Sequence, residues 1–210
     1  MRINRYLDIN MTWKECKYLI VSDLKREMRH VSLSRFFYYY CIKESIKVSV
    51  WLRLGSYLMT KKSLIYRLLY YFVKVFYKHI EHKTGIQVPI GAHIAEGLKF
   101  FHHGCIIIAQ SAKIGKNASI HQGVTIGRVF AGAKAGVPTI GDNVVIFAGA
   151  KLLGNITVGS GAVIGANAVV VKDVPANAVV AGIPAKVISD DSNRCFTKEW
   201  GEVFAHGYYE

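Results

Sequence analysis

The sequence predicts an α+β chain in which a helical N-terminal segment precedes a parallel β-helix. The main observation is an aliphatic residue at every sixth position, with one interruption. A helix repeats near 3.6 residues and a strand at two, so a period of six indicates a short strand and a corner. The residues in register are Ile108, Ile114, Ile120, Ile126, Ile140, Ile146, Leu152, Val158, Ile164 and Val170. The second observation is helical patterning of apolar residues before this repeat begins.

Two helical stretches are expected first. Residues 12–30 form one of them, because Thr12 and Glu15 have the spacing of a capping box at a helix N-terminus. Residues 34–59 continue with helical patterning, and Gly55 inside that pattern weakens the expectation locally.

A third helical stretch, residues 62–83, ends before Gly85, a suitable C-cap. The chain then divides into three expected parts. Residues 1–85 form a helical domain and residues 86–188 a β-helix of about five coils, at roughly eighteen residues per three-sided coil. Residues 189–210 form a polar, partly aromatic tail.

The interruption in the repeat predicts a loop. Ile140 follows Ile126 by fourteen positions rather than six, so residues 128–139 carry extra chain rich in Gly and Ala. A solenoid expels insertions from one corner, often onto its binding face. Arg128 and Lys134 lie in this loop and suit an anionic ligand. A tolerated surface insertion is the alternative.

Positive charge is concentrated at the front of the chain. The net charge is +13, and residues 1–85 hold 17 Lys and Arg against 6 Asp and Glu, whereas residues 86–210 hold 10 against 8. The first segment also holds 16 of the 25 aromatic residues. The positive charge suits peripheral contact with anionic lipid headgroups, and its role stays open. For the aromatic residues, packing of the helices within an oligomer is the favoured interpretation. No recognition motif supports nucleic-acid binding.

Several observations bear on location. No run of 18 uncharged apolar residues predicts a transmembrane helix, and charges interrupt any signal-peptide core near the N-terminus. The cysteines, Cys16, Cys41, Cys105 and Cys195, lack paired spacing and are interpreted as free thiols. We therefore expect a cytoplasmic protein, with contact at the inner face of the membrane as an extension.

Histidines mark the region where chemistry is expected. The repeat slips by two residues across 102–104, which contains His102 and His103, and His121 follows just over one coil later. Imidazole titrates near neutral pH and is the usual general base for an alcohol. Adjacent residues of an extended chain face opposite ways, so only one of the first two can face a given cleft. A structural role stays open for each.

The motifs around these histidines resemble those of the hexapeptide-repeat acyltransferases. The resemblance covers roughly residues 86–188 and rests on segments 97–102, 106–108, 113–115, 124–127 and 182–186. The nearest branch looks like the serine acetyltransferases and their relatives that O-acetylate bacterial surface polysaccharides, of the capsule and colanic-acid type. It implies a left-handed β-helix, a homotrimer or dimer of trimers, and active sites between subunits.

The resemblance also implies roles for particular residues. His102 takes the place of the catalytic base, and acetyl passes directly from acetyl-CoA to the acceptor, without a metal. His103 and His121 are ranked as acceptor contacts or structural residues, and Cys105 as a small buried thiol rather than a nucleophile. The positions that match acetyl-CoA contacts are Ala148, Gly149, Ala166 and Lys186, to which we add Arg128 and Lys134 of the loop.

Three departures from the serine acetyltransferase pattern bear on the acceptor. Gln87 replaces a carboxylate that orients the histidine, Phe101 replaces an aspartate that helps to hold serine, and Gly136-Val137 replaces an Arg-His pair. Those groups would grip the charged ends of serine by charge-assisted hydrogen bonds. Their loss favours a larger neutral acceptor, such as a sugar stacked on an exposed Phe101.

The leading prediction is therefore an acetyl-CoA-dependent O-acetyltransferase acting on a glycan hydroxyl in surface polysaccharide synthesis. The first alternative is serine O-acetyltransferase, of cysteine biosynthesis. More remote are a γ-type carbonic anhydrase with three zinc-binding histidines and a non-catalytic scaffold. The sequence leaves open the sugar and its hydroxyl, whether the acceptor is free, lipid-linked or polymeric, trimer against hexamer, and a longer acyl donor.

Overall fold

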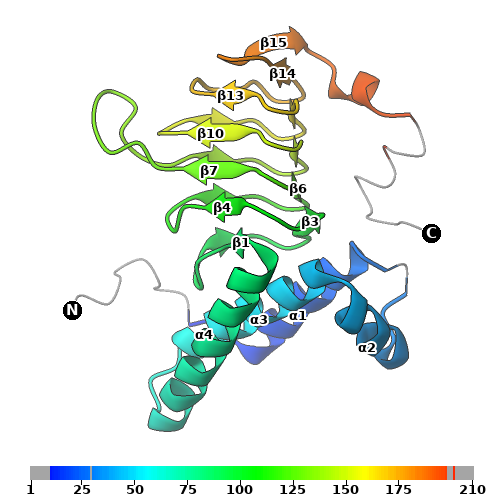
Figure 1. Cartoon of the computed structure of the whole chain (residues 1–210), viewed down its shortest axis with the longest axis vertical. Helices are drawn as coiled ribbons and strands as arrows, with labels where there is room; N and C mark the ends of the chain where they lie inside the picture. Colours follow the sequence, from blue (N-terminus) through cyan, green and yellow to red (C-terminus); the bar gives the residue numbers. More distant parts are fainter. Residues whose placement is uncertain (1–9, 29, 198–200, 202–210) are drawn as a thin grey trace.

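The computed structural model describes residues 10–28, 30–197 and 201 of the chain. Within these residues, four α-helices lie at one end and a left-handed parallel β-helix stands on them (Figure 1). The helices are α1 (Trp13–Lys25), α2 (Leu33–Ile42), α3 (Glu44–Met59) and α4 (Leu64–Thr84). The predicted α+β fold is confirmed. In the described ranges, no helix is long and apolar enough to cross a membrane.

The first helix begins where its capping box indicates. The Thr12 side chain accepts a hydrogen bond from the backbone N–H of Glu15, and the Glu15 carboxylate accepts one from the backbone N–H of Thr12. The prediction of one continuous stretch over 34–59 is wrong. Lys43 adopts an extended conformation (φ −110°, ψ 114°) and separates α2 from α3. Gly55 fits inside α3 because a Cβ atom there would come within 2.9 Å of an isoleucine side chain of the first coil.

The strands form three sheets, which are the walls of the β-helix. The first wall contains β1 (Ile86–Gln87), β4 (Ile106–Ile108), β7 (Thr125–Gly127), β10 (Lys151–Leu153) and β13 (Val169–Val170). The second contains β2 (His93–Ile94), β5 (Lys113–Ile114), β8 (Thr139–Ile140) and β11 (Thr157–Val158). The third contains β3 (Lys99–Phe101), β6 (Ser119–His121), β9 (Val145–Ile146), β12 (Val163–Ile164), β14 (Val179–Ala181) and β15 (Lys186–Ser189). Strand β15 pairs antiparallel with β14.

The six-residue period becomes three stacked ladders of aliphatic side chains, one behind each wall. In the first wall, for example, Ile108 pairs with Ile126, Ile126 with Leu152, and Leu152 with Val170. All ten residues in register are at most 3% exposed. The extra chain after β7 leaves the second ladder intact, because Ile114 still pairs with Ile140. The loop was therefore predicted at the right place.

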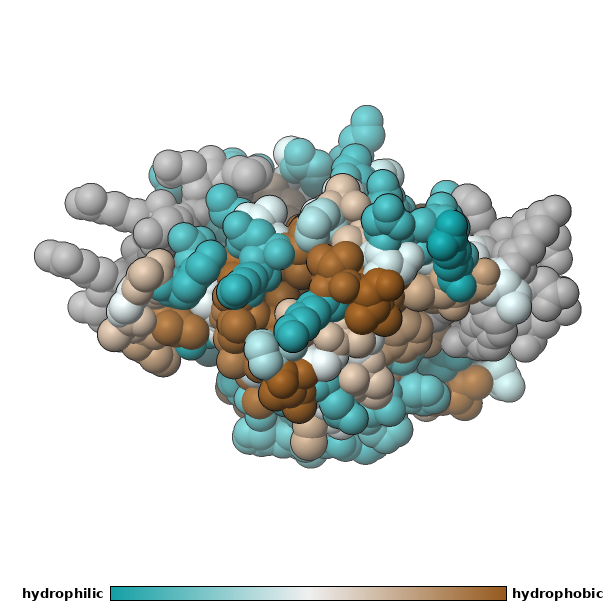
Figure 2. Space-filling view, turned by 90° about the horizontal axis from the view of Figure 1, so that it is seen from above, coloured by the Kyte–Doolittle hydropathy of each residue, from teal (hydrophilic) through white to brown (hydrophobic). Residues whose placement is uncertain are grey.

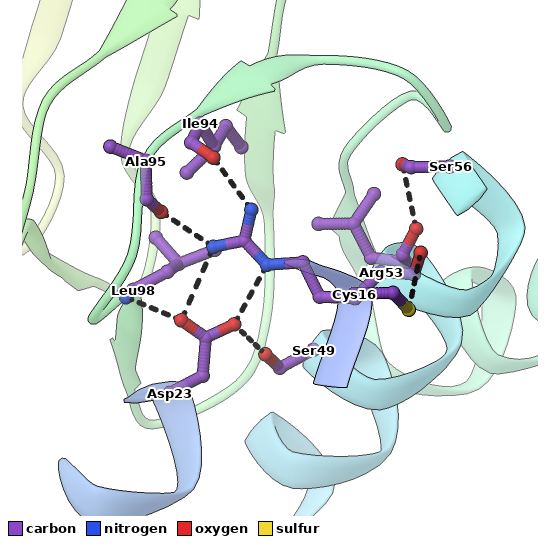
Figure 3. Close-up of polar contacts among 9 residues, drawn as sticks. Cys16, Asp23, Ser49, Arg53, Ser56, Ile94, Ala95 and Leu98 are labelled. Carbon is purple, nitrogen blue, oxygen red and sulfur yellow. Dashed lines mark hydrogen bonds and ion pairs between the residues drawn. The ribbon is translucent and has the colours of Figure 1, made fainter. Parts of the chain in front are cut away.

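A buried ion pair fastens the helices to the first coil (Figure 3). Arg53 of α3 donates to Asp23 of α1 from Nε at 2.9 Å and from Nη2 at 3.2 Å. The same guanidinium donates to the carbonyl oxygens of Ile94 and Ala95, each at 2.6 Å. The Asp23 carboxylate also accepts from the backbone N–H of Leu98 at 2.9 Å. Because Asp23 and Arg53 are 3% and 4% exposed, this network replaces water for both charges.

The opposite end of the β-helix carries apolar surface. Ile183, Val187 and Ile188 are exposed there, around strand β15. Figure 2 views the molecule from this end and shows hydrophobic residues interspersed with hydrophilic ones.

Candidate active site

His102 lies at a corner of the β-helix. The chain turns there from β3 in the third wall to β4 in the first, and His102, Gly104 and Cys105 all have positive φ, at 63°, 114° and 53°. The predicted slip in the repeat is thus a tight, left-handed turn. His102 and His103 are exposed. The expectation of a buried Cys105 thiol is wrong, since the turn directs this residue outward and it is exposed.

The turns that stack above His102 form one continuous edge, which we call the His102 corner: residues 102–105, 122–124, 147–150 and 165–168. Backbone hydrogen bonds of 2.9 Å join successive turns, from Gly123 N to Gly104 O, from Gly149 N to Gln122 O, and from Asn167 N to Ala148 O. Three of the predicted acetyl-CoA positions, Ala148, Gly149 and Ala166, therefore lie above His102 on the same edge.

Lys186 lies near the upper end of that edge. It pairs with Ala181 across the antiparallel β14–β15 ladder and is exposed. Strand β14 is four strand spacings from β3, or about 19 Å at roughly 4.8 Å each. The small side chains at Ala148, Gly149 and Ala166 leave the backbone between the two ends accessible to a long, flexible ligand.

Phe101, at the end of β3, and His121, at the end of β6, form a stacked pair beside the His102 corner. Their ring centroids are 4.5 Å apart with an interplanar angle of 9°, and Phe101 is only 5% exposed. The expectation that Phe101 offers an open face to a sugar is wrong for this chain, because His121 covers that face. His121 Nδ1 lies 3.1 Å from the Ile146 carbonyl oxygen. Burial, aided by the nearby charges of His102 and Lys99, lowers the pKa of His121.

A pocket of about 400 Å³ opens beside His102. Its lining includes Glu27, Lys43 and Lys99 together with Phe101, His102 and His103. Lys99 is 2% exposed, its Nζ lies 4.5 Å from the centroid of the Phe101 ring, and burial lowers its pKa to about 8. Glu27 is held by Lys43 Nζ at 2.9 Å and by a serine hydroxyl.

That Glu27 and Lys43 line this pocket was not predicted from the sequence. Glu27 lies beyond the end of α1 and Lys43 lies between α2 and α3, so no local motif connects them with residues 99–103. The one available signal was Lys99 itself, a charged residue beside two phenylalanines at the start of the repeat.

Gln87 lies on β1 of the first wall, is exposed and pairs in register with Ile107. Within the part of the chain that the structure describes, Gln87 makes no hydrogen bond to His102. The predicted orienting role therefore has no support from a single chain.

The loop of residues 128–139 leaves a different corner. It departs from β7 in the first wall and returns at β8 in the second, so it lies at the far edge of the first wall from His102. Arg128 Nη2 donates to the Ser111 hydroxyl at 3.1 Å, and Lys134 Nζ lies 3.8 Å from an Asp173 oxygen. One chain alone does not bring these two cations to the His102 corner.

Among the described residues, no group of three or more His, Cys, Asp or Glu side chains could hold a metal ion. His121, which a zinc site would need, is instead occupied by its stack on Phe101 and its contact with Ile146.

Comparisons with known proteins find similarity to acetyltransferases in both sequence and structure. Residues 138–172 match the family described as bacterial transferase hexapeptide (six repeats). Serine acetyltransferases of Staphylococcus xylosus and Staphylococcus aureus are 43% identical over 124 residues, which is 59% of this chain and 55% of each relative. The chain thus spans about half the length of these relatives.

Solved structures of serine acetyltransferases have a similar fold. The serine acetyltransferase of Neisseria gonorrhoeae in complex with serine has a TM-score of 0.68 at 28% identity, over 84% of this chain and 70% of that one. The soybean serine acetyltransferase complexed with serine has a TM-score of 0.66 at 28% identity, over 82% and 69%. Residues 138–172 thus match a hexapeptide transferase family, and the chain is similar in sequence and in fold to serine acetyltransferases.

Proposed function

We propose that this chain is an acetyl-CoA-dependent O-acetyltransferase in which His102 is the general base. The observation that carries the proposal is the single edge of the β-helix on which exposed His102 lies below Ala148, Gly149 and Ala166, with Lys186 near its upper end. A base therefore lies at one end of a long strip with small side chains, and a cation lies at the other. Acetyl-CoA is an elongated molecule with phosphates at one end and a thioester at the other, which suits this arrangement.

The chemistry needs only a base and a fixed geometry. Acetyl-CoA supplies an acyl group activated as a thioester. His102 accepts the proton of the acceptor hydroxyl as its oxygen forms a bond to the acyl carbon, and the same proton passes to the departing CoA sulfur. Backbone N–H groups of the corner are suited to stabilise the oxyanion. The left-handed turn at residue 102 holds the imidazole outside the wall, where both substrates can reach it.

A second subunit completes the proposed site. The loop cations Arg128 and Lys134 lie at the far edge of the first wall from His102, so only a neighbouring copy can bring them to the His102 corner. We therefore propose a homotrimer or dimer of trimers with its active sites between subunits. Because acetyl-CoA is the donor, the reaction is proposed for the cytoplasm.

Serine is the acceptor that the comparisons favour. The relatives and structures described above are serine acetyltransferases, and both structures contain serine. The comparisons therefore support serine O-acetylation better than acetylation of a polysaccharide.

Specific residues keep a saccharide acceptor as the second candidate. Phe101 and Val137 replace groups expected to hold serine, and Gln87 replaces a carboxylate expected to orient the histidine. The pocket of about 400 Å³ beside His102 also falls in the range that accommodates ligands larger than an amino acid. The buried position of Phe101 removes stacking on its face from this argument.

Release of free CoA from acetyl-CoA, measured with serine and with a panel of saccharides, tests both candidates. Serine-dependent release with a higher kcat/KM than any saccharide assigns serine as the acceptor. Saccharide-dependent release that exceeds it assigns a glycan hydroxyl. Absence of release with every acceptor, in protein that binds acetyl-CoA, would contradict the proposed activity for this acceptor range.

A separate prediction concerns Lys186, which lies near the upper end of the His102 corner. Lys186→Gln is expected to raise the KM for acetyl-CoA about five- to tenfold with little change in kcat, because it removes one charge-assisted contact to a phosphate far from the reacting atoms. Steady-state kinetics with varied acetyl-CoA measures it. Lys113→Gln is the matched control, since Lys113 is also exposed but lies on the second wall. An equal effect of both variants would contradict the role of Lys186.

A further inference from the structure

Helix α4 presents an apolar stripe that nothing in the described chain covers. Leu64, Leu68, Phe72 and Val75 recur at i, i+4, i+8 and i+11 and are 68%, 63%, 67% and 73% exposed. At 3.6 residues per turn these four side chains share one face of the helix. Further exposed apolar residues extend the stripe: Ile65, Leu69, Tyr71 and Phe76.

The opposite face of α4 attaches it to the molecule. Val73, Tyr77, Ile80 and Thr84 are buried, and Tyr77 donates a hydrogen bond from its hydroxyl to the Val88 carbonyl oxygen at 2.8 Å. Tyr77 and Ile80 also belong to the core that continues into the β-helix. The exposed stripe therefore cannot turn inward without breaking this core.

The exposed charges beside the stripe all have the same sign. Residues 45–80 contain seven Lys and Arg and no Asp or Glu. Arg67 and Lys74, both exposed, lie together along one border of the stripe, because a spacing of seven residues returns to nearly the same direction. Lys78 lies on the same border but is paired with the buried carboxylate of Glu81. An apolar face with a cationic border is the pattern of a helix that lies in the headgroup region of an anionic bilayer.

The same charges argue against a second copy as the occupant. Two α4 stripes packed face to face in an antiparallel pair would bring Arg67 and Lys74 of the two copies to the same side, and residues 45–80 contain no acidic residue that could neutralise them. Such like-charge juxtaposition is unfavourable, whereas anionic headgroups would neutralise the same border.

The geometry suits a lipid surface. Helix α4 has 21 residues and a length of about 32 Å, and it runs away from the β-helix at the end opposite β15 (Figure 1). We propose that α4 docks this protein on an anionic lipid bilayer, with its apolar stripe in the interface and its cations among the headgroups. The helix lies on the membrane and does not span it.

Flotation of the full chain with phosphatidylcholine vesicles, with and without phosphatidylglycerol, tests the proposal. We expect association with the anionic vesicles only, weakened by added salt. Phe72→Gln/Val75→Gln should weaken the partition at least tenfold, because it removes two apolar side chains from the interface. Phe130→Gln/Ile188→Gln is the matched control, since these residues are also exposed (88% and 67%) but lie in the loop of residues 128–139 and on β15, away from α4, and it should leave the partition unchanged.

The charges are tested separately. Arg67→Gln/Lys74→Gln should weaken the partition roughly 30-fold, at about 1 kcal/mol for each cation near an anionic surface. Lys113→Gln/Lys172→Gln removes the same charge from exposed positions on the β-helix and should change the partition far less. Absence of flotation, or equal flotation with neutral vesicles, would overturn the proposal. So would a solution mass that falls on Phe72→Gln/Val75→Gln, because the stripe would then be an interface between copies.

Discussion

Replacement of His102 with alanine is expected to lower kcat by about 10²- to 10⁴-fold, the usual contribution of a general base. The KM for acetyl-CoA should change little, because the proposed donor contacts lie higher on the corner, at Ala148, Gly149, Ala166 and Lys186. His102 is exposed, so we expect the variant to keep the fold. Steady-state release of CoA with the best acceptor measures the effect.

His103→Ala is the matched control for this prediction. His103 is the adjacent residue, is exposed and lines the same pocket, yet the proposed mechanism gives it no proton transfer. It should alter the KM for the acceptor rather than reduce kcat by orders of magnitude. If the two variants lose kcat equally, or if His102→Ala keeps it, the assignment of His102 as the base is wrong.

Arg53→Met is expected to lower the free energy of unfolding by about 3–5 kcal/mol, because it leaves the carboxylate of Asp23 buried without its counterion. It also removes the donors to the carbonyl oxygens of Ile94 and Ala95. Urea denaturation followed by circular dichroism measures the loss. Arg67→Met is the matched control, a cation on the exposed side of a helix, and should change stability by less than about 0.5 kcal/mol.

Replacing Asp23 as well as Arg53 separates the contribution of the ion pair from the loss of side-chain volume. If the pair acts as a unit, Asp23→Leu/Arg53→Met should be less destabilising than the sum of the two single variants. Additive losses would show that Asp23 and Arg53 contribute independently, and would contradict the network as the fastening between α1, α3 and the first coil.

Much of the fold follows from local pattern. The six-residue period places the aliphatic side chains inside each wall, and Thr12 with Glu15 marks the start of α1. Helix boundaries are less well predicted by the sequence pattern. Helix α1 ends at Lys25 rather than near residue 30, and Lys43 breaks a stretch that has helical patterning throughout. An extended residue between two amphipathic segments leaves no signal in the period of either one.

The site is predictable only in part, and for a physical reason. The period that stacks the coils also aligns Ala148, Gly149 and Ala166 above His102, so that edge could be inferred once the repeat and the family resemblance were combined. The stack of Phe101 on His121 depends on neighbouring coils, and the contributions of Glu27 and Lys43 depend on how the helices pack against β3. Such contacts join residues far apart in the chain and have no local signature.

Strand β15 has a consequence for solubility. Parallel strands that stack without limit would expose hydrogen-bonding groups at the last coil, as the growing tip of a fibril does. Here the chain reverses after β14, and β15 pairs antiparallel with it through a register irregularity between Val179 and Val180. A further coil from another molecule would meet a strand of the wrong direction, with Lys186 projecting from it. The reversal therefore acts as a terminator, and together with the helices under the first coil it keeps a repeat of indefinite length finite.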